Sequence, residues 1–132
     1  MAIGKRKIIL ILIIAVLALA AAFILLRHLL PASLDKPESI VWNDSTGTFM
    51  VSNVGSGKIL SLEEEGRYTV FAKGLKAPRG LKVVDELLYV TDDTSIVALD
   101  LKTGEQKANI PIKGAKMLND IEKDHLGKLY LT

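Results

Sequence analysis

Three polar residues recur at nearly equal spacing in the chain: Glu38, Arg79 and Asn119 are separated by 41 and 40 residues. If this spacing is that of a structural repeat arranged in a ring, equivalent inner positions converge on the central channel. A carboxylate and an amide oxygen are hard ligands of the kind that Ca²⁺, Mg²⁺ or Mn²⁺ accept. The pattern therefore predicts a polar site with cation-binding chemistry. The alternative interpretation is that the mouth of such a channel is polar because it is wet.

The residues around these three positions repeat as well. The segments 37–42, 78–83 and 118–123 align with one another, and so do 49–52, 88–91 and 129–132, each an apolar or aromatic run ending in Ser or Thr. Third and fourth strands are expected at 58–62, 68–72, 95–99 and 106–110. Turn residues such as Asp44 and Gly47 separate the strands. Four short strands in about forty residues predict an all-β chain of β-propeller blades, 38–75, 76–115 and an incomplete 116–132.

Aromatic side chains recur on these expected strands, and we expect them to pack between blades; they are Trp42, Phe49, Tyr89 and Tyr130. Propellers have about four to eight blades, whereas the chain supplies about two and a half. We therefore expect it to be a fragment that is inactive alone. Self-assembly of short chains into a ring is the alternative.

The N-terminal part has a different character. Nineteen consecutive apolar residues, from Ile8 to Leu26, follow Lys5, Arg6 and Lys7. Such a run suits a transmembrane helix, and cations before it favour a cytoplasmic N-terminus. Residues 1–30 are thus interpreted as a cytoplasmic basic stub and a transmembrane signal anchor, 31–37 as a linker and 38–132 as a partial propeller on the periplasmic or extracellular side. A cleavable signal peptide is the alternative.

Composition excludes several other functions. The chain of 132 residues has 17 Lys and Arg against 15 Asp and Glu, a net charge of +2, and its first thirty residues hold four of the cations and no acid. The remainder is slightly acidic, so nucleic acid is not an expected partner. The absence of Cys excludes disulfides, thiolate metal sites and a Cys nucleophile.

Residues 37–132 resemble the six-bladed propellers of the senescence marker protein/gluconolactonase family. The resemblance rests on the motifs Pro-Glu-Ser-Ile-Val-Trp at 37–42, Ala-Pro-Arg-Gly-Leu at 77–81 and Leu-Asn-Asp-Ile at 118–121. It implies that Glu38 binds a divalent metal and that Asn119 and Asp120 line the substrate pocket. Arg79 shares the repeat position of both motifs and is taken as a further substrate-binding candidate. The metal implied is Ca, Mg, Mn or Zn.

The same resemblance implies a metal-dependent hydrolase of a small lactone or ester, in its complete form. The apolar run at 8–26 adds that the protein is anchored in a membrane by its N-terminal helix. The sequence departs from the family pattern at Met117, where an Arg is common, and at Ile40, where a Pro is common. Two alternatives stay open: a non-enzymatic propeller similar to NHL repeats, which binds a protein or glycan, and a strictosidine-synthase-like propeller. No protein partner is identified from the sequence.

Overall fold

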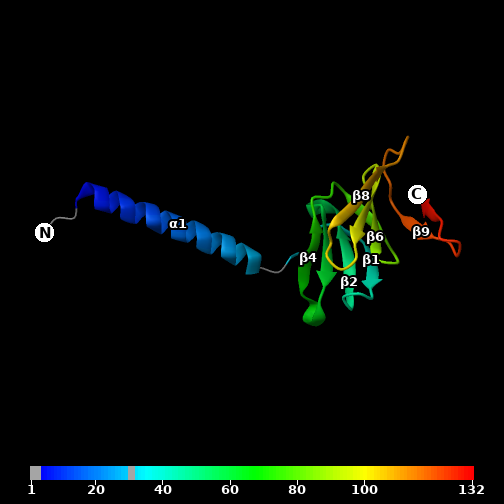
Figure 1. Ribbon diagram of the computed structural model, residues 1–132, viewed down its shortest axis with the longest axis horizontal. Coiled ribbons are helices and arrows are strands. Elements are labelled where there is room, and N and C mark those ends of the chain that lie inside the picture. Colours follow the sequence, from blue (N-terminus) through cyan, green and yellow to red (C-terminus); the bar gives the residue numbers. More distant parts are fainter. Residues whose placement is uncertain (1–3, 30–31) are drawn as a thin grey trace. The chain divides into compact units, whose positions relative to one another are not determined.

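The computed structural model describes residues 4–29 and 32–132. The chain divides into two compact units at the boundary between Pro31 and Ala32. The first contains one α-helix and the second contains all the β-strands (Figure 1). This is the predicted fold class, a partial β-propeller of four-stranded antiparallel sheets preceded by one apolar helix.

The helix α1 runs from Lys5 to Leu29. Within it, Lys5–Leu26 is long and apolar enough to cross a membrane, judged by length and composition. At about 1.5 Å per residue this stretch extends roughly 33 Å, close to the thickness of a bilayer's hydrocarbon core. Its apolar side chains are exposed in this unit, where a soluble helix would bury at least one face.

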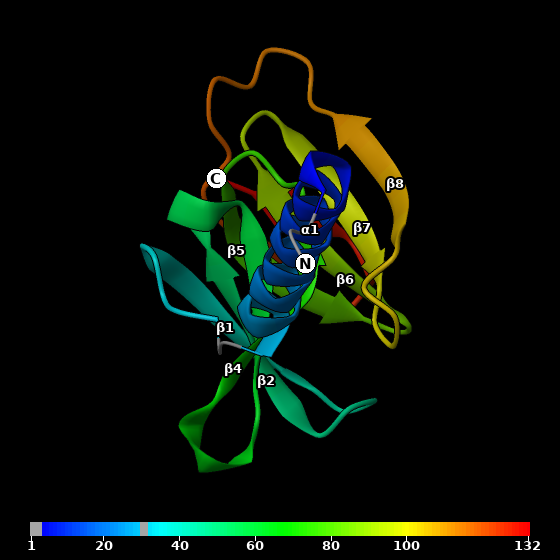
Figure 2. The same ribbon diagram turned by 90° about the vertical axis from the view of Figure 1, so that its left-hand side faces the viewer.

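The second unit contains two four-stranded sheets and one two-stranded sheet, each with strands in sequence order and antiparallel (Figure 2). The first sheet comprises β1 (Pro37–Asn43), β2 (Thr48–Asn53), β3 (Lys58–Leu62) and β4 (Tyr68–Lys73). The second comprises β5 (Pro78–Val84), β6 (Leu87–Asp92), β7 (Ser95–Asp100) and β8 (Gln106–Pro111). The third comprises β9 (Ile121–Lys123) and β10 (Leu129–Leu131). Short 3₁₀ helices η1 (Val54–Ser56) and η2 (Glu64–Gly66) lie in the first sheet's connections.

The two larger sheets share an irregularity in their first strand pair as well as their strand order. The pairing register shifts between Pro37 and Ile40 in the first sheet, and between Pro78 and Leu81 in the second. A bulge of this kind bends a strand and re-aims the side chains within it. Glu38 and Arg79 lie inside these two irregular segments, so the same backbone device positions both residues.

The core forms where neighbouring sheets face each other. One cluster joins Met50 and Ile59 of the first sheet to Leu88 and Val90 of the second, all fully buried. A second cluster joins Ile96 to residues of the third sheet, including Ile121. Alternation of side chains along each strand sends one set of apolar residues to each face. The second sheet therefore packs on both sides, as a blade inside a propeller does.

The sequence predicts a linker at residues 31–37. Pro31 lies outside the described residues, whereas residues 32–36 are described. They are hydrogen-bonded to the first sheet. The Asp35 N–H donates to Oδ1 of buried Asn53 at 2.6 Å, and the Ala32 N–H donates to the Tyr68 carbonyl at 2.9 Å. In the next repeat, Oδ1 of Asp92 accepts the Lys76 N–H at 2.9 Å in the same manner. The segment thus repeats the connection between blades and belongs to the folded unit.

Most of the aromatic residues expected to pack between blades lie elsewhere. Trp42 and Phe49 are exposed and contact each other edge-on, with ring centroids 4.9 Å apart. Tyr130 is also exposed, whereas Tyr89 packs against the second core cluster. The expectation is wrong for Trp42, Phe49 and Tyr130 in this unit because they lie on the outer faces of the first and third sheets, which no described residue covers.

Candidate functional site

The structure brings together three of the four residues that the sequence singled out. Glu38 on β1 lines a polar cavity of about 160 Å³ with Asn119 and Asp120, which directly precede β9. Ser39 and Gly80 complete its lining. The cavity therefore collects groups from all three sheets at the starts of their first strands.

Two backbone connections hold the second and third repeats together at this cavity. The Gly80 N–H is shared between the Asn119 carbonyl, at 2.9 Å, and the hydroxyl oxygen of Thr91, at 2.8 Å. The Thr91 hydroxyl donates in turn to the Asn119 carbonyl at 3.2 Å. Thr91 is fully buried, so its hydroxyl fixes the backbone of Asn119 relative to β5.

The equivalent hydroxyl in the first sheet belongs to Ser52. Its oxygen accepts the Ser39 N–H at 2.9 Å. The sequence carries a signal for this role, since Ser52 and Thr91 end the repeated apolar runs 49–52 and 88–91. The structure shows that these hydroxyls position the backbone of Ser39 and Gly80, two cavity residues that the sequence analysis missed.

Gly80 is required by the close approach of the third repeat. A Cβ at this position would lie 2.7 Å from Cα of Asp120 and 2.9 Å from the Ile121 backbone nitrogen. Both distances are shorter than side-chain Cβ contacts allow. The absence of a side chain on Gly80 therefore permits Asp120 to reach the cavity.

Arg79 lies beside Glu38 and is not among the five lining residues of the cavity. Its Nη1 atom is 3.5 Å from Oε2 of Glu38, and the exposed fractions of the two side chains are 24% and 39%. Nε of Arg79 is buried and has no hydrogen-bond partner among the described residues. The positive charge is thus held mostly away from solvent, next to the carboxylate expected to bind metal.

The donors around the cavity match a hard divalent cation in part. Two carboxylates, Glu38 and Asp120, and the Asn119 amide are oxygen donors of the type found around Ca²⁺, Mg²⁺ and Mn²⁺. One Asp120 oxygen, Oδ1, already accepts the Ile121 N–H at 2.8 Å. Within residues 4–29 and 32–132, no group of three or more His, Cys, Asp or Glu side chains is placed to hold a metal. The cavity supplies part of a coordination sphere and lacks the nitrogen or sulfur donors that Zn²⁺ favours.

A second cavity, of about 250 Å³, adjoins the first through Glu38 and Ser39. The other residues lining it are mostly apolar or aromatic: Leu34, Pro37, Ile40, Val51 and Tyr68. Glu38 thus lies between a small polar cavity and a larger, less polar one.

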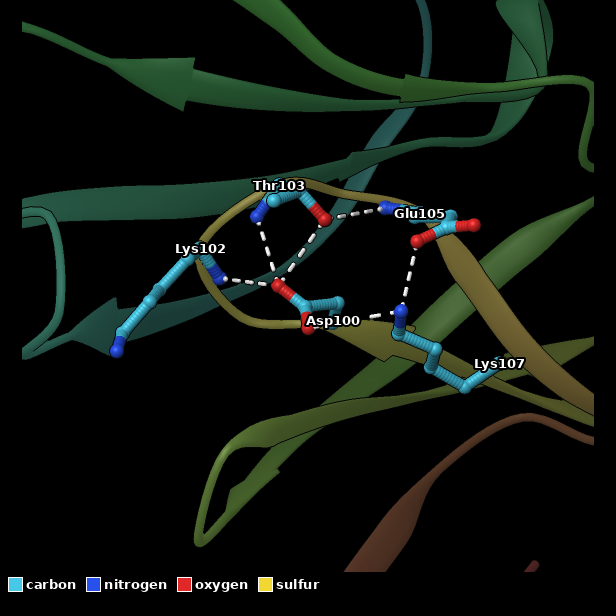
Figure 3. Close-up of polar contacts among 5 residues, drawn as sticks. All are labelled: Asp100, Lys102, Thr103, Glu105 and Lys107. Carbon is cyan, nitrogen blue, oxygen red and sulfur yellow. Dashed lines mark hydrogen bonds and ion pairs between the residues drawn. The ribbon is translucent and has the colours of Figure 1, made fainter.

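Two carboxylates with shifted pKa values, Asp100 and Asp124, accept hydrogen bonds from turn residues and do not line these cavities. Asp100 accepts the backbone N–H of Thr103 at 2.9 Å, the hydroxyl of the same residue at 3.0 Å and the N–H of Lys102 at 3.0 Å (Figure 3). These hydrogen bonds, with the nearby Lys107 cation, lower the pKa of Asp100. The pKa of Asp124 is lowered in the same way by the backbone N–H of Lys128 and by Tyr130. Such carboxylates stabilise turns and give no indication of acid–base chemistry.

Comparison with known proteins supports the fold. No family model matches the chain, and no curated protein matches it. Among solved structures, a gluconolactonase from Xanthomonas campestris superimposes with a TM-score of 0.61 at 19% sequence identity. The match covers 77% of this chain and 36% of the gluconolactonase, so the chain spans about a third of that protein's length. At this identity the likeness concerns the fold: residues 32–132 have the architecture of part of a gluconolactonase-like β-propeller.

Proposed function

We propose that a complete propeller containing these blades hydrolyses a small lactone or ester with the help of a divalent cation. One observation carries the proposal: Glu38, Asn119 and Asp120, from different repeats, line a single polar cavity. The likeness of the fold to a gluconolactonase supports the same reaction class.

In this proposal Glu38 is a metal ligand, and the Asn119 amide and Asp120 carboxylate face the cation and the substrate. Bound there, the cation supplies a Lewis acid that polarises a carbonyl or lowers the pKa of a bound water. The Thr91 hydroxyl holds the backbone of Asn119, and Gly80 leaves room for Asp120. Arg79 offers guanidinium donors to substrate oxygens near Glu38.

The surroundings of Glu38 favour a substrate with an apolar portion. The larger cavity beside Glu38 is lined by Leu34, Ile40 and Val51 among others. Met117, at the position where the gluconolactonase family commonly has Arg, is exposed and carries no charge. A small lactone or ester with few hydroxyl groups suits these walls better than a sugar lactone.

The test is Glu38→Gln in the full-length protein. We expect this change to lower Mn²⁺ affinity, measured by titration calorimetry, and lactone hydrolysis by about 100-fold or more, because a charged ligand is lost. Glu122→Gln is the matched control, since Glu122 pairs with Lys82 and does not line the cavity. Unchanged Mn²⁺ binding and turnover in Glu38→Gln would favour a non-enzymatic binding propeller.

We further propose that α1 anchors the protein in a membrane with the N-terminus in the cytoplasm. The cations Lys5, Arg6 and Lys7 precede the apolar stretch, as the distribution of positive charge in membrane proteins favours. Protease added to intact spheroplasts should then digest the propeller unit. Protection of that unit, with digestion only after lysis, would contradict the proposed orientation.

A further inference from the structure

The ion pair between Glu38 and Arg79 joins equivalent positions on neighbouring inner strands. Both residues lie in the irregular segment that opens β1 or β5. The separation of 3.5 Å between Arg79 Nη1 and Glu38 Oε2 exceeds the roughly 2.7–2.9 Å of a strong charged hydrogen bond. The guanidinium is therefore close enough for electrostatic attraction without being locked to the carboxylate.

The two sides of Glu38 differ in charge. On one side is the Arg79 cation, about three-quarters buried. On the other is the polar cavity with Asn119 and the Asp120 carboxylate. A divalent cation bound to Glu38 would lie within a few ångströms of Arg79, where like charges repel and solvent screens them less than at the surface.

We propose that Arg79 is a resident counter-ion of Glu38, which a divalent cation must displace in order to bind. The inference rests on the cation site of the proposed function and adds that Arg79 competes with the cation for Glu38. Without the cation, Arg79 neutralises a carboxylate that otherwise faces Asp120 across the cavity. With the cation bound, the guanidinium is released. Nε of Arg79, which has no partner among the described residues, is then a donor for an oxygen atom of the substrate.

The competition predicts an increase in cation affinity when the charge of Arg79 is removed. Two like charges a few ångströms apart repel each other more strongly in a buried site than in water. Because Glu38 and Arg79 are partly exposed, the expected effect is moderate. Arg79→Gln should therefore bind Ca²⁺ and Mn²⁺ about tenfold more tightly than the unmodified chain.

The experiment is a calorimetric titration of the full chain in detergent micelles with Ca²⁺ and with Mn²⁺. Lys82→Gln is the matched control, because it removes the same charge from the same strand while Lys82 pairs with Glu122 outside the cavity. It should leave the affinity within about twofold. Arg79→Lys keeps the charge and should also stay near the unmodified value.

A second measurement needs no variant. In a ¹⁵N spectrum of the arginine side chains, Ca²⁺ should move the Arg79 Nε–H signal and leave that of Arg67, which pairs with Glu63, unchanged. Equal or weaker cation binding in Arg79→Gln, or an unmoved Arg79 signal at saturating Ca²⁺, would overturn the inference while leaving the cation site in place. Absence of cation binding in both the unmodified chain and Arg79→Gln would overturn the site and the inference together.

Discussion

The two four-stranded sheets have the same strand order and the same irregularity in their first strand pair, yet they differ in burial. Leu81 of the second sheet is 6% exposed, whereas its repeat equivalent in the first sheet, Ile40, is 59% exposed. The second sheet packs against a neighbour on each face, and the first packs on one face. Repeat-equivalent residues thus acquire different energetic roles from their neighbours, although their local structure is the same.

The largest expected effect comes from truncating this pair of equivalent residues. Leu81→Ala removes buried apolar volume between two sheets and should lower the free energy of unfolding by about 2–5 kcal/mol. Ile40→Ala should change it by about 0.5 kcal/mol or less, as surface substitutions do. Urea denaturation of the full chain in detergent, followed by circular dichroism, measures both values. A similar loss for both variants would mean that the open face of the first sheet is covered in solution.

A smaller effect is expected from the equivalent positions Ser39 and Gly80. Gly80→Ala places a Cβ against the backbone of Asp120 and should cost about 1–3 kcal/mol of stability through overpacking. It should also weaken Mn²⁺ binding, because Asp120 moves. Ser39 already carries a Cβ, so Ser39→Ala should change the stability by about 0.5 kcal/mol or less. Denaturation and calorimetric titration compare the two variants, and an unaffected Gly80→Ala would contradict the close approach described here.

The smallest effect concerns two carboxylates at equivalent turns, Glu63 and Asp100. The pKa of Glu63 is lowered chiefly by its hydrogen bond with Arg67, and that of Asp100 chiefly by the backbone N–H of Thr103. Each lowered pKa stabilises the fold at pH values above the unfolded-state pKa, about 4. That stability is lost as the pH falls through the lower, folded-state pKa.

Added salt should affect the pKa values of these two carboxylates differently. Added NaCl screens the exposed pair of Glu63 and Arg67 more than the backbone hydrogen bonds of Asp100. Carboxyl ¹³C titrations at low and high salt should therefore move the Glu63 pKa toward its ordinary value and leave that of Asp100 nearly fixed. Equal salt sensitivity would show that the Lys107 cation, and not the turn, determines the pKa of Asp100.

Much of the fold could be predicted because it depends on local patterns. Alternating apolar residues and turn residues mark the strands, and the forty-residue period assigns them to blades. The same period explains why Glu38 and Asn119 could be predicted to share one place. Both belong to the opening of an inner strand, and both line the same cavity, whereas their roles there stay a prediction.

The remainder depends on contacts between repeats, which no local pattern specifies. The need for Gly80 arises from the distance to Asp120, and the pairing of Arg79 with Glu38 from the register of neighbouring blades. The exposure of Trp42 and Phe49 depends on what covers the first sheet. A signal for residues 32–36 did exist: Asn53 and Asp92 each follow the hydroxyl residue that ends a repeated apolar run.

The attachment of residues 32–36 through Asn53 has an evolutionary consequence. The Asp35 N–H donates to the side chain of Asn53, and the Lys76 N–H donates to the side chain of Asp92. The segment before the first blade is therefore bound to its blade in the same way as the segment before the second blade. Tandem duplication can therefore lengthen such an array without redesigning its junctions. The same kind of junction follows the helix α1 in one repeat and the strand β4 in the next, so it does not depend on the type of element that precedes it.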